Sequence, residues 1–193
     1  GIYRTALVIG SDVLSKLLDW TDRGTCVLFG DGAGAAVLKA EETGVVDMLM
    51  GSDGTKGPIL SCTSRTLGNF LTGTRPELGL MTMDGQEVFR FAVKKVPESI
   101  EILLERNHIS REEIKYYVLH QANHRILEGV AKRMKVPLER FYENIGRYGT
   151  TSAATIPIAL DEMAEQELLR PGQWIMCLGF GAGLTWGGAM FRW

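Results

Sequence analysis

The residues best suited to chemistry in this sequence follow the apolar run Ile114–Leu119, in the segment His-Gln-Ala-Asn-His-Arg. The run predicts a buried strand that stops at His120, and the spacing of the next apolar residues predicts a helix over Asn123–Met134. Side chains at such strand–helix junctions point into the cleft at the end of a sheet, where α/β proteins hold their sites. His120, Asn123 and Arg125 are therefore candidate site residues.

Two other interpretations of this segment stay open. A single histidine at a strand end can be a hydrogen-bonded structural residue. His124 is a second candidate, but its position inside the predicted helix favours a solvated or packing role. Two glycine-rich loops, residues 146–152 and 179–183, close comparable junctions, and their convergence favours a site at His120.

The elements that must position these residues alternate between strands and helices, which predicts an α/β layered unit. Apolar runs predict strands at residues 5–9, 26–29, 35–39, 45–50, 114–119, 174–178 and 184–192, the first two of them buried. Spacing and capping residues predict a helical turn or two at 13–18 and helices at 86–104, 123–134 and 153–168, the last capped by Ser152. Pro97 can kink or restart its helix, and Ser110 with Glu113 matches a capping box. Residues 51–76 predict a long irregular connection.

Residues 28–38 and residues 178–190 echo each other, because each predicts a strand, a glycine turn and a second strand. We expect matching hairpins in two related halves, residues 1–85 and residues 86–193. The second half looks complete, whereas the first has only its closing strands. Apolar strands that lack covering helices would be exposed, so we expect the chain to be a fragment or one piece of a cleaved protein.

The composition argues against several classes of protein. With 21 Lys and Arg against 23 Asp and Glu, the net charge of −2 does not fit a nucleic-acid binder that relies on a bulk basic surface. No apolar run approaches the ~18 residues of a membrane span, and Gly1–Trp20 lacks the pattern of a secretory signal. Three cysteines without CxxC spacing predict neither a disulfide framework nor a metal site, so a reducing compartment is the simplest expectation.

Two further patterns predict no site. Gly30–Ala35 fits the dinucleotide fingerprint G-x-G-x-x-A, but that fingerprint must open a helix, and the residues after it favour a strand. A tight structural turn is expected there instead. Cys26 and Cys177 lie in apolar runs where a thiolate is costly, and nothing in the sequence marks Cys62 as activated, so no cysteine here is expected to be a nucleophile.

Four ordered motifs carry a resemblance to a known family: TDRGTCVLFGDGAGAAVL at 22–38, HQANHRI at 120–126, NIGRYGTTSAATIPIAL at 144–160 and GFGAGLTWG at 179–187. They resemble β-ketoacyl-acyl-carrier-protein synthase III, the initiating condensing enzyme of type II fatty acid synthesis, from about Thr5 to Trp193. The resemblance implies a thiolase-like α/β fold of two related αβαβα halves, the second complete here and the first represented by its closing strands. It also implies decarboxylative Claisen condensation of an acyl-CoA with malonyl-acyl-carrier protein, and acetyl-CoA is the expected acyl-CoA. No cofactor or metal is implied, because CoA and phosphopantetheine thioesters are the substrates.

The resemblance assigns His120 to the family histidine that holds the malonyl thioester carbonyl while negative charge develops on it. A neutral imidazole that donates one N–H suits this role better than a general base. The backbone N–H groups of Gly181, Ala182 and Gly183 resemble the donor for the thioester oxyanion. The family's second donor is an asparagine in Gly-Asn-Thr-Ser, and Thr150 stands in its place. A threonine hydroxyl can still donate one hydrogen bond, although a role in capping the next helix stays open.

The substrate and partner contacts carry over by position. Arg23 and Gly24 match residues that meet the CoA end of the substrate, Gly85 and Phe89 match positions along the pantetheine tunnel, and Asn123 would hydrogen-bond the pantetheine amides. The segment Gln121, Ala122, Asn123, His124 and Arg125 resembles the carrier-protein docking segment, in which Arg125 offers a cation. Arg23 and Arg125 can also be ordinary solvated charges.

One departure bears on the whole reaction: no cysteine here lies in the family's nucleophile motif, which would stand upstream of Gly1. We therefore expect an N-terminal segment or a second chain to carry the nucleophile. The resemblance also implies a homodimer of complete protomers. The cytoplasm is the expected location, and the plastid stroma stays open as an alternative location. The alternatives are a relative with another starter or acceptor, and a non-catalytic homologue that binds the carrier protein.

Overall fold

The computed structural model describes residues 2–62, 67–76 and 79–193. Its main sheet has four strands in the order β3 (Val45–Ser52), β8 (Thr185–Arg192), β7 (Trp174–Gly181) and β6 (Ile114–Leu119). β6 and β7 run parallel, and the other two pairs are antiparallel. The connection from β6 to β7 is a long helical crossover, as parallel pairs require.

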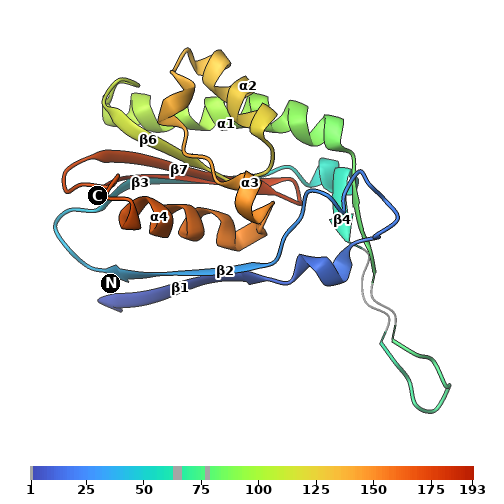
Figure 1. Cartoon of the computed structure of the whole chain (residues 1–193). Coiled ribbons are helices and arrows are strands. Elements are labelled where there is room, and N and C mark those ends of the chain that lie inside the picture. Colours follow the sequence, from blue (N-terminus) through green and yellow to red (C-terminus); the bar gives the residue numbers. More distant parts are fainter. Residues whose placement is uncertain (1, 63–66, 77–78) are drawn as a thin grey trace.

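Helices cover both faces of this sheet (Figure 1). α1 (Gly85–Asn107) and α2 (His124–Met134) lie on one face, and α4 (Thr155–Glu165) lies on the other. Successive residues of a strand point to opposite faces, so Val118, Ile175 and Cys177 pack with the α4 side while Leu119 and Met176 pack with the α1 side. Because both faces are buried, β6 and β7 appear in the sequence as nearly continuous apolar runs.

α1 begins at Asp84, whose carboxylate accepts hydrogen bonds from the backbone N–H groups of Gln86 and Glu87. The helix continues through Pro97 to Asn107, and His108 ends it in the left-handed conformation. The predicted helix at 86–104 is confirmed, and Pro97 does not restart it. The predicted apolar face of α2 is also confirmed, since Ile126, Leu127, Val130 and Met134 are buried.

A separate antiparallel pair, β1 (Thr5–Asp12) with β2 (Gly32–Lys39), lies on the far side of α4 (Figure 1). The predicted strands exist, but the expectation that the first is buried is wrong. Leu7, Ile9 and Val37 are 62%, 63% and 70% exposed, because α4 and the turn before it cover only one side of the pair. Gly10 lies so close to this turn that a Cβ would meet the carbonyl oxygen of Ala153 at 2.2 Å.

The strand predicted at residues 26–29 is wrong. Residues 24–28 form turns, and only Phe29 makes an isolated bridge, to Thr150. β2 pairs with β1 rather than with this segment, so residues 28–38 are not a hairpin, although β7 and β8 form the hairpin predicted at 178–190. The fingerprint glycines open β2 and not a helix, as expected for a structural turn.

β3 shows that the sheet boundary differs from the proposed division after residue 85. It lies in the segment 1–85 yet pairs with β8, so the four-stranded unit begins before that division. The pairing of β3 with β8 sets this boundary, and the sequence of β3 by itself does not indicate which sheet the strand will join.

The remaining elements are short: η1 (Leu14–Leu17), η2 (Gly54–Ile59), β4 (Leu60–Cys62), β5 (Met81–Met83), η3 (Leu138–Arg140), α3 (Ile145–Tyr148) and η4 (Ser152–Ala154). The predicted connection at 51–76 therefore contains η2 and β4, and its residues 63–66 lie outside the described residues.

Ser152 does not cap α4, because it starts η4 with a positive φ and makes no capping hydrogen bond. In the predicted capping box Glu113 accepts from the Ser110 N–H, but a strand follows instead of a helix. Within the described ranges, no helix has the length and apolarity to cross a membrane.

Candidate active site

His120 stands directly after β6, and its position is set by the backbone and by one aromatic neighbour. Its N–H donates to the carbonyl of Leu178 on β7, at 2.9 Å. Its imidazole meets the ring of Phe180 edge-on, with the ring centres 5.2 Å apart. The residue is only 9% exposed, so its small accessible surface faces the cavity that it lines.

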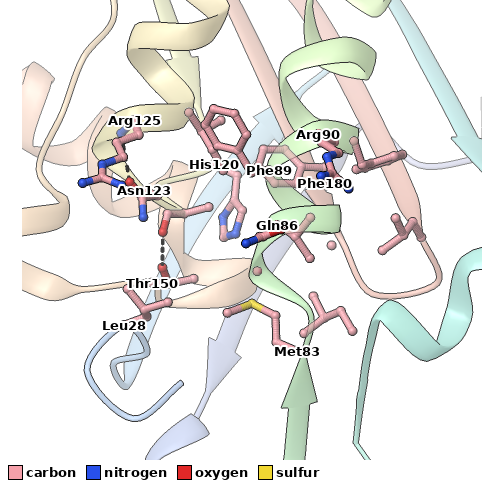
Figure 2. Close-up of a pocket in the computed structure, with 18 of the residues that line it drawn as sticks. Leu28, Met83, Gln86, Phe89, Arg90, His120, Asn123, Arg125, Thr150 and Phe180 are labelled. Atoms are coloured by element: carbon pink, nitrogen blue, oxygen red, sulfur yellow. Dashed lines mark hydrogen bonds between the residues drawn. The ribbon is translucent and has the colours of Figure 1, made fainter. Parts of the chain in front are cut away.

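That cavity has a volume of about 590 Å³ and is mostly apolar. Figure 2 shows the His120 imidazole projecting into it. Its lining comes from the 28–29 segment, from β4 and β5, from α1, from α2 and the residues before it, and from Thr150 and the β7–β8 hairpin. The residues are Leu28, Phe29, Leu60, Met83, Gly85, Gln86, Val88, Phe89, Arg90, Phe91, His120, Ala122, Asn123, Arg125, Ile126, Thr150, Phe180, Gly181 and Leu184. A long, thin ligand could thus reach His120 along an apolar path from an exposed rim.

Burial lowers the pKa of His120 to about 4. Desolvation disfavours the charged imidazolium, so the ring is neutral at physiological pH. A neutral imidazole has one N–H donor and one acceptor nitrogen. Such a ring can stabilise a developing oxyanion by donating a hydrogen bond. It is poorly suited to act as a general acid, because the imidazolium form that would give up a proton is not populated at neutral pH.

We expect the stability of the protein to fall as the pH drops from 6.5 towards 4. In this range the unfolded chain protonates His120, whose ordinary pKa is 6.5, while the folded chain does not until about 4. At about 1.4 kcal/mol per pKa unit, the loss amounts to roughly 3 kcal/mol. Urea unfolding at several pH values, for the wild type and for His120→Gln, measures it as the difference between the two pH profiles.

His124 provides the opposite sign in the same experiment. Its hydrogen bond to Glu143 raises its pKa, so its contribution to stability is present at low pH and is lost as the pH rises. His124→Gln should therefore remove a gain in stability that accompanies acidification above pH 6.5, and should leave the slope between pH 6.5 and 4 nearly unchanged. Identical profiles for wild type and His120→Gln would show that His120 is not buried in neutral form.

Thr150 lies beside this histidine and is 5% exposed. Its hydroxyl donates to the backbone carbonyl of Gln121 at 2.9 Å. It also donates to the carbonyl of Ala122 at 3.2 Å, the bond drawn in Figure 2. A hydroxyl has a single proton, so this proton is engaged by backbone carbonyls and does not face the cavity. The Thr150 N–H donates to Leu28 and its carbonyl accepts from Gly30, which joins the loop to the 28–30 segment.

The loop that carries Thr150 is anchored by Glu162 of α4, which is 7% exposed. Its carboxylate accepts from Asn144 at 2.6 Å and from the Tyr148 hydroxyl at 2.8 Å, and it pairs with Arg147. Burial acts to raise the pKa of Glu162, but these hydrogen bonds and the arginine outweigh it and lower the pKa. The ionised carboxylate therefore holds the loop from Asn144 to Tyr148 against α4.

Comparisons with known proteins match this arrangement along most of the chain. A family model described as 3-oxoacyl-(acyl-carrier-protein) synthase III C terminal matches residues 104–193, and one described as 3-oxoacyl-(acyl-carrier-protein) synthase III matches residues 1–54. The chain belongs to the 3-oxoacyl-acyl-carrier-protein synthase III family. The resemblance seen in the sequence is thereby confirmed.

Individual relatives agree with this assignment. The β-ketoacyl-(acyl-carrier-protein) synthase III of Thermosynechococcus vestitus is 50% identical over 201 residues, and that of Clostridium novyi is 48% identical over 195 residues. The crystal structure of 3-oxoacyl-(acyl carrier protein) synthase III from Pseudomonas aeruginosa has a TM-score of 0.90 at 40% identity, and covers 100% of this chain and 59% of that chain. The structure from Thermus thermophilus has a TM-score of 0.88 at 38% identity, and covers 98% of this chain and 59% of that chain. The thiolase-like α/β fold is confirmed.

The chain spans 60% of the length of these curated synthase III relatives, while each alignment covers all of this chain.

Among the residues that the family resemblance selected, the structure brings several to one cavity: His120, Thr150, Gly85, Phe89, Ala122, Asn123, Arg125 and Gly181. Asn123 has a second task, because its side-chain oxygen accepts the N–H of Arg125 and so caps α2. Arg125 is exposed, and it has no ion pair with any residue that the structure describes.

Other selected residues lie away from this cavity. Arg23 and Gly24 are exposed in a turn and do not line it. His124 is exposed and pairs with Glu143 and Glu128, which matches the solvated role expected for it. Gln121 is 1% exposed, so its assignment to the docking surface is wrong, since its side chain points into the protein and not to solvent.

The hairpin glycines divide between two cavities. Gly181 lines both, whereas Ala182 lines a second cavity of about 810 Å³, which His120 and Thr150 also line. Gly183 lines neither of them and has a φ of 132°, which only glycine adopts readily. The second cavity also contains Cys62, whose thiol donates to the Gly79 carbonyl at 3.3 Å.

Sequence reasoning missed several residues of the site. Phe180, Met83, Gln86 and Arg90 line the cavity with His120, and Phe180 packs on its ring. Phe180 lies within the motif GFGAGLTWG, so the motif could have identified it. Met83 gave no signal, because β5 is three residues long. Within residues 2–62, 67–76 and 79–193, no group of three His, Cys, Asp or Glu side chains is arranged to hold a metal ion.

Proposed function

We propose that this chain forms part of a condensing enzyme that joins an acyl group from acyl-CoA to malonyl-acyl-carrier protein, with loss of CO₂, as the initiating step of fatty acid synthesis. The observation that carries the proposal is the buried, neutral His120 in an apolar cavity whose lining includes the exposed cation Arg125. The names of the relatives, β-ketoacyl-acyl-carrier-protein synthase III, support the same reaction. Acetyl-CoA is the proposed starter, and CoA and phosphopantetheine thioesters act as substrates and not as cofactors.

His120 has a defined role in this reaction. When the malonyl carbon–carbon bond breaks, CO₂ leaves and the electron pair moves onto the thioester carbonyl, which becomes an enolate. The His120 N–H donates to that oxygen, and it does so from an apolar cavity where a hydrogen bond is stronger than in water. The enolate carbon then attacks the acyl thioester, and the thiolate leaves. The imidazole stays neutral throughout, as its lowered pKa requires.

The nucleophile for the acyl-transfer half comes, in this proposal, from a cysteine outside this sequence. Burial raises the pKa of Cys177 to about 12, which makes its thiolate inaccessible at neutral pH. The exposed apolar side of β1 and β2, with Leu7, Ile9 and Val37, supports a covering segment or second chain there. We include in the proposal a homodimer of complete protomers, in the cytoplasm or the plastid stroma.

Labelled acetyl transfer tests the function. The complete enzyme is incubated with radiolabelled acetyl-CoA, and the labelled cysteine is mapped by mass spectrometry before malonyl-acyl-carrier protein is added. We expect label on a cysteine outside this sequence, followed by its transfer into acetoacetyl-carrier protein. Label on Cys62, which shares a cavity with His120, would move the nucleophile into this chain. Binding of carrier protein without any labelling would favour the non-catalytic homologue and overturn the enzyme proposal.

Thr150→Asn should raise the rate of condensation. An asparagine amide has two N–H groups, so one can satisfy the carbonyls of Gln121 and Ala122 while the other faces the enolate. We expect a rise of up to about tenfold, less than the full value of one oxyanion donor because His120 already donates. Thr150→Val is the matched control, since it keeps the shape and removes the hydroxyl. A fall in rate in both variants would show that the Thr150 hydroxyl itself serves the reaction.

A further inference from the structure

Gln121 is buried although it follows the candidate catalytic histidine directly. Its exposed fraction is 1%, and its side chain extends into the protein rather than into the cavity. A buried amide needs partners for two N–H groups and one carbonyl oxygen, and an unmatched group would be costly.

Each group of the Gln121 amide has a partner. The Nε2 atom donates to the carbonyl of Leu119 at 3.0 Å and to the carbonyl of Tyr142 at 3.0 Å. The Oε1 atom accepts the N–H of Asn144 at 3.0 Å. The reversed amide would set its N–H₂ group against the Asn144 N–H and its oxygen against two carbonyls, so the partners define one orientation. The side chain thereby ties the end of β6 to the start of the loop that carries Thr150.

The backbone of Gln121 is held as firmly as its side chain. Its N–H donates to the Thr155 hydroxyl at 2.9 Å, at the first residue of α4. Its carbonyl accepts from the Thr150 hydroxyl at 2.9 Å, across 29 positions of sequence. The peptide unit before His120 is fixed as well, by the hydrogen bond from the His120 N–H to Leu178.

These contacts leave His120 little backbone freedom. The peptide units on both sides of its Cα are hydrogen-bonded to different elements, β7 on one side and α4 on the other. Phe180 limits the remaining side-chain rotation. We propose that Gln121, through its amide and through the Thr155 hydroxyl, is a positioning residue that fixes the His120 imidazole relative to the Thr150 loop. The proposal rests on the proposed function insofar as it concerns the rate of decarboxylation.

Two pairs of variants of the complete enzyme test this role. Thr155→Val keeps the side-chain shape and removes the acceptor for the Gln121 N–H, whereas Thr155→Ser keeps the acceptor. Gln121→Glu keeps the size and the accepting oxygen but removes both donors, and Gln121→Met removes all three contacts. Each variant is assayed for kcat and KM in malonyl-carrier-protein decarboxylation. The NMR shift of the His120 ring protons is measured as well, because the adjacent Phe180 ring perturbs it strongly.

We expect Thr155→Val and Gln121→Glu to lower kcat by about tenfold to 10²-fold, as small displacements of a reacting group do. KM for malonyl-carrier protein should change little, since neither residue lines the cavity of about 590 Å³ that includes Arg125. The His120 ring shift should move in both variants, and Thr155→Ser should restore kcat and shift. A wild-type kcat and ring shift in Thr155→Val would overturn the proposal, as would equal damage in Thr155→Ser.

The two readouts separate this proposal from the function on which it rests. If the wild type does not decarboxylate malonyl-carrier protein, the proposed function fails, and the ring shift in the Thr155 pair still decides the positioning role. If the Gln121 variants do not fold, the Thr155 pair still tests the contact that holds the Gln121 N–H, because each of its substitutions changes a single hydroxyl or methyl group.

Discussion

His120→Ala should lower the rate of malonyl-carrier-protein decarboxylation by about 10²–10³-fold, the value of one oxyanion donor in other enzymes. His120 is a buried neutral donor that lines the cavity, and the Thr150 hydroxyl cannot replace it because its proton is bound to backbone carbonyls. Acyl transfer from acyl-CoA to the enzyme should fall much less, because that step forms its oxyanion elsewhere. Release of labelled CO₂ measures the first step, and mass spectrometry of the acylated enzyme measures the second.

His124→Ala is the matched control for this prediction. His124 lies four positions further on, is exposed, and pairs with Glu143 outside the cavity, so its loss should leave both steps near the wild-type rate. His120→Gln keeps an N–H donor and should recover part of the activity. Equal rates for His120→Ala and wild type, at an unchanged melting temperature, would remove His120 from the mechanism.

Arg125→Glu should weaken binding of the acyl-carrier protein by about tenfold to 10²-fold at low ionic strength, and less at high salt. Arg125 is an exposed cation of the cavity lining, where an acidic carrier protein or the phosphate of its prosthetic group would arrive. The substitution should not unfold the chain. Residue 125 lies in the first turn of α2, where a glutamate interacts favourably with the helix dipole. Titration calorimetry at two ionic strengths measures the effect.

Arg133→Glu is the control for a change of net charge. Arg133 is exposed in the last turn of the same helix and does not line the cavity, so its reversal should change the affinity only slightly. Equal losses in Arg125→Glu and Arg133→Glu would mean that the partner responds to overall charge and not to the cavity rim. An unchanged affinity in Arg125→Glu would remove the docking assignment.

Much of the site could be predicted because its signals are local. The run Ile114–Leu119 and the helical spacing over residues 123–134 place His120 at a strand–helix junction without reference to any other part of the chain. The β7–β8 hairpin is local in the same sense, since its strands are joined by a short turn. Hydrophobic periodicity and capping depend on neighbours a few residues apart, which a sequence displays directly.

The rest of the site depends on contacts between distant segments. The family resemblance places Gln121 in the docking segment with Arg125, yet Gln121 is buried and hydrogen-bonds to Tyr142, Asn144 and Thr155. Phe29 could be predicted as a strand residue, yet it makes an isolated bridge to Thr150. β3 ends at Ser52, yet its partner in the sheet is β8, which begins only at Thr185.

The sequence by itself therefore determined which residues could do chemistry, the family motifs and the order of most strands and helices. Only the tertiary structure decided the neutral state of His120, the inward turn of the Thr150 hydroxyl and the burial of Gln121. Desolvation and hydrogen-bond partnership are properties of the space around a group, and that space is filled by segments remote in the chain.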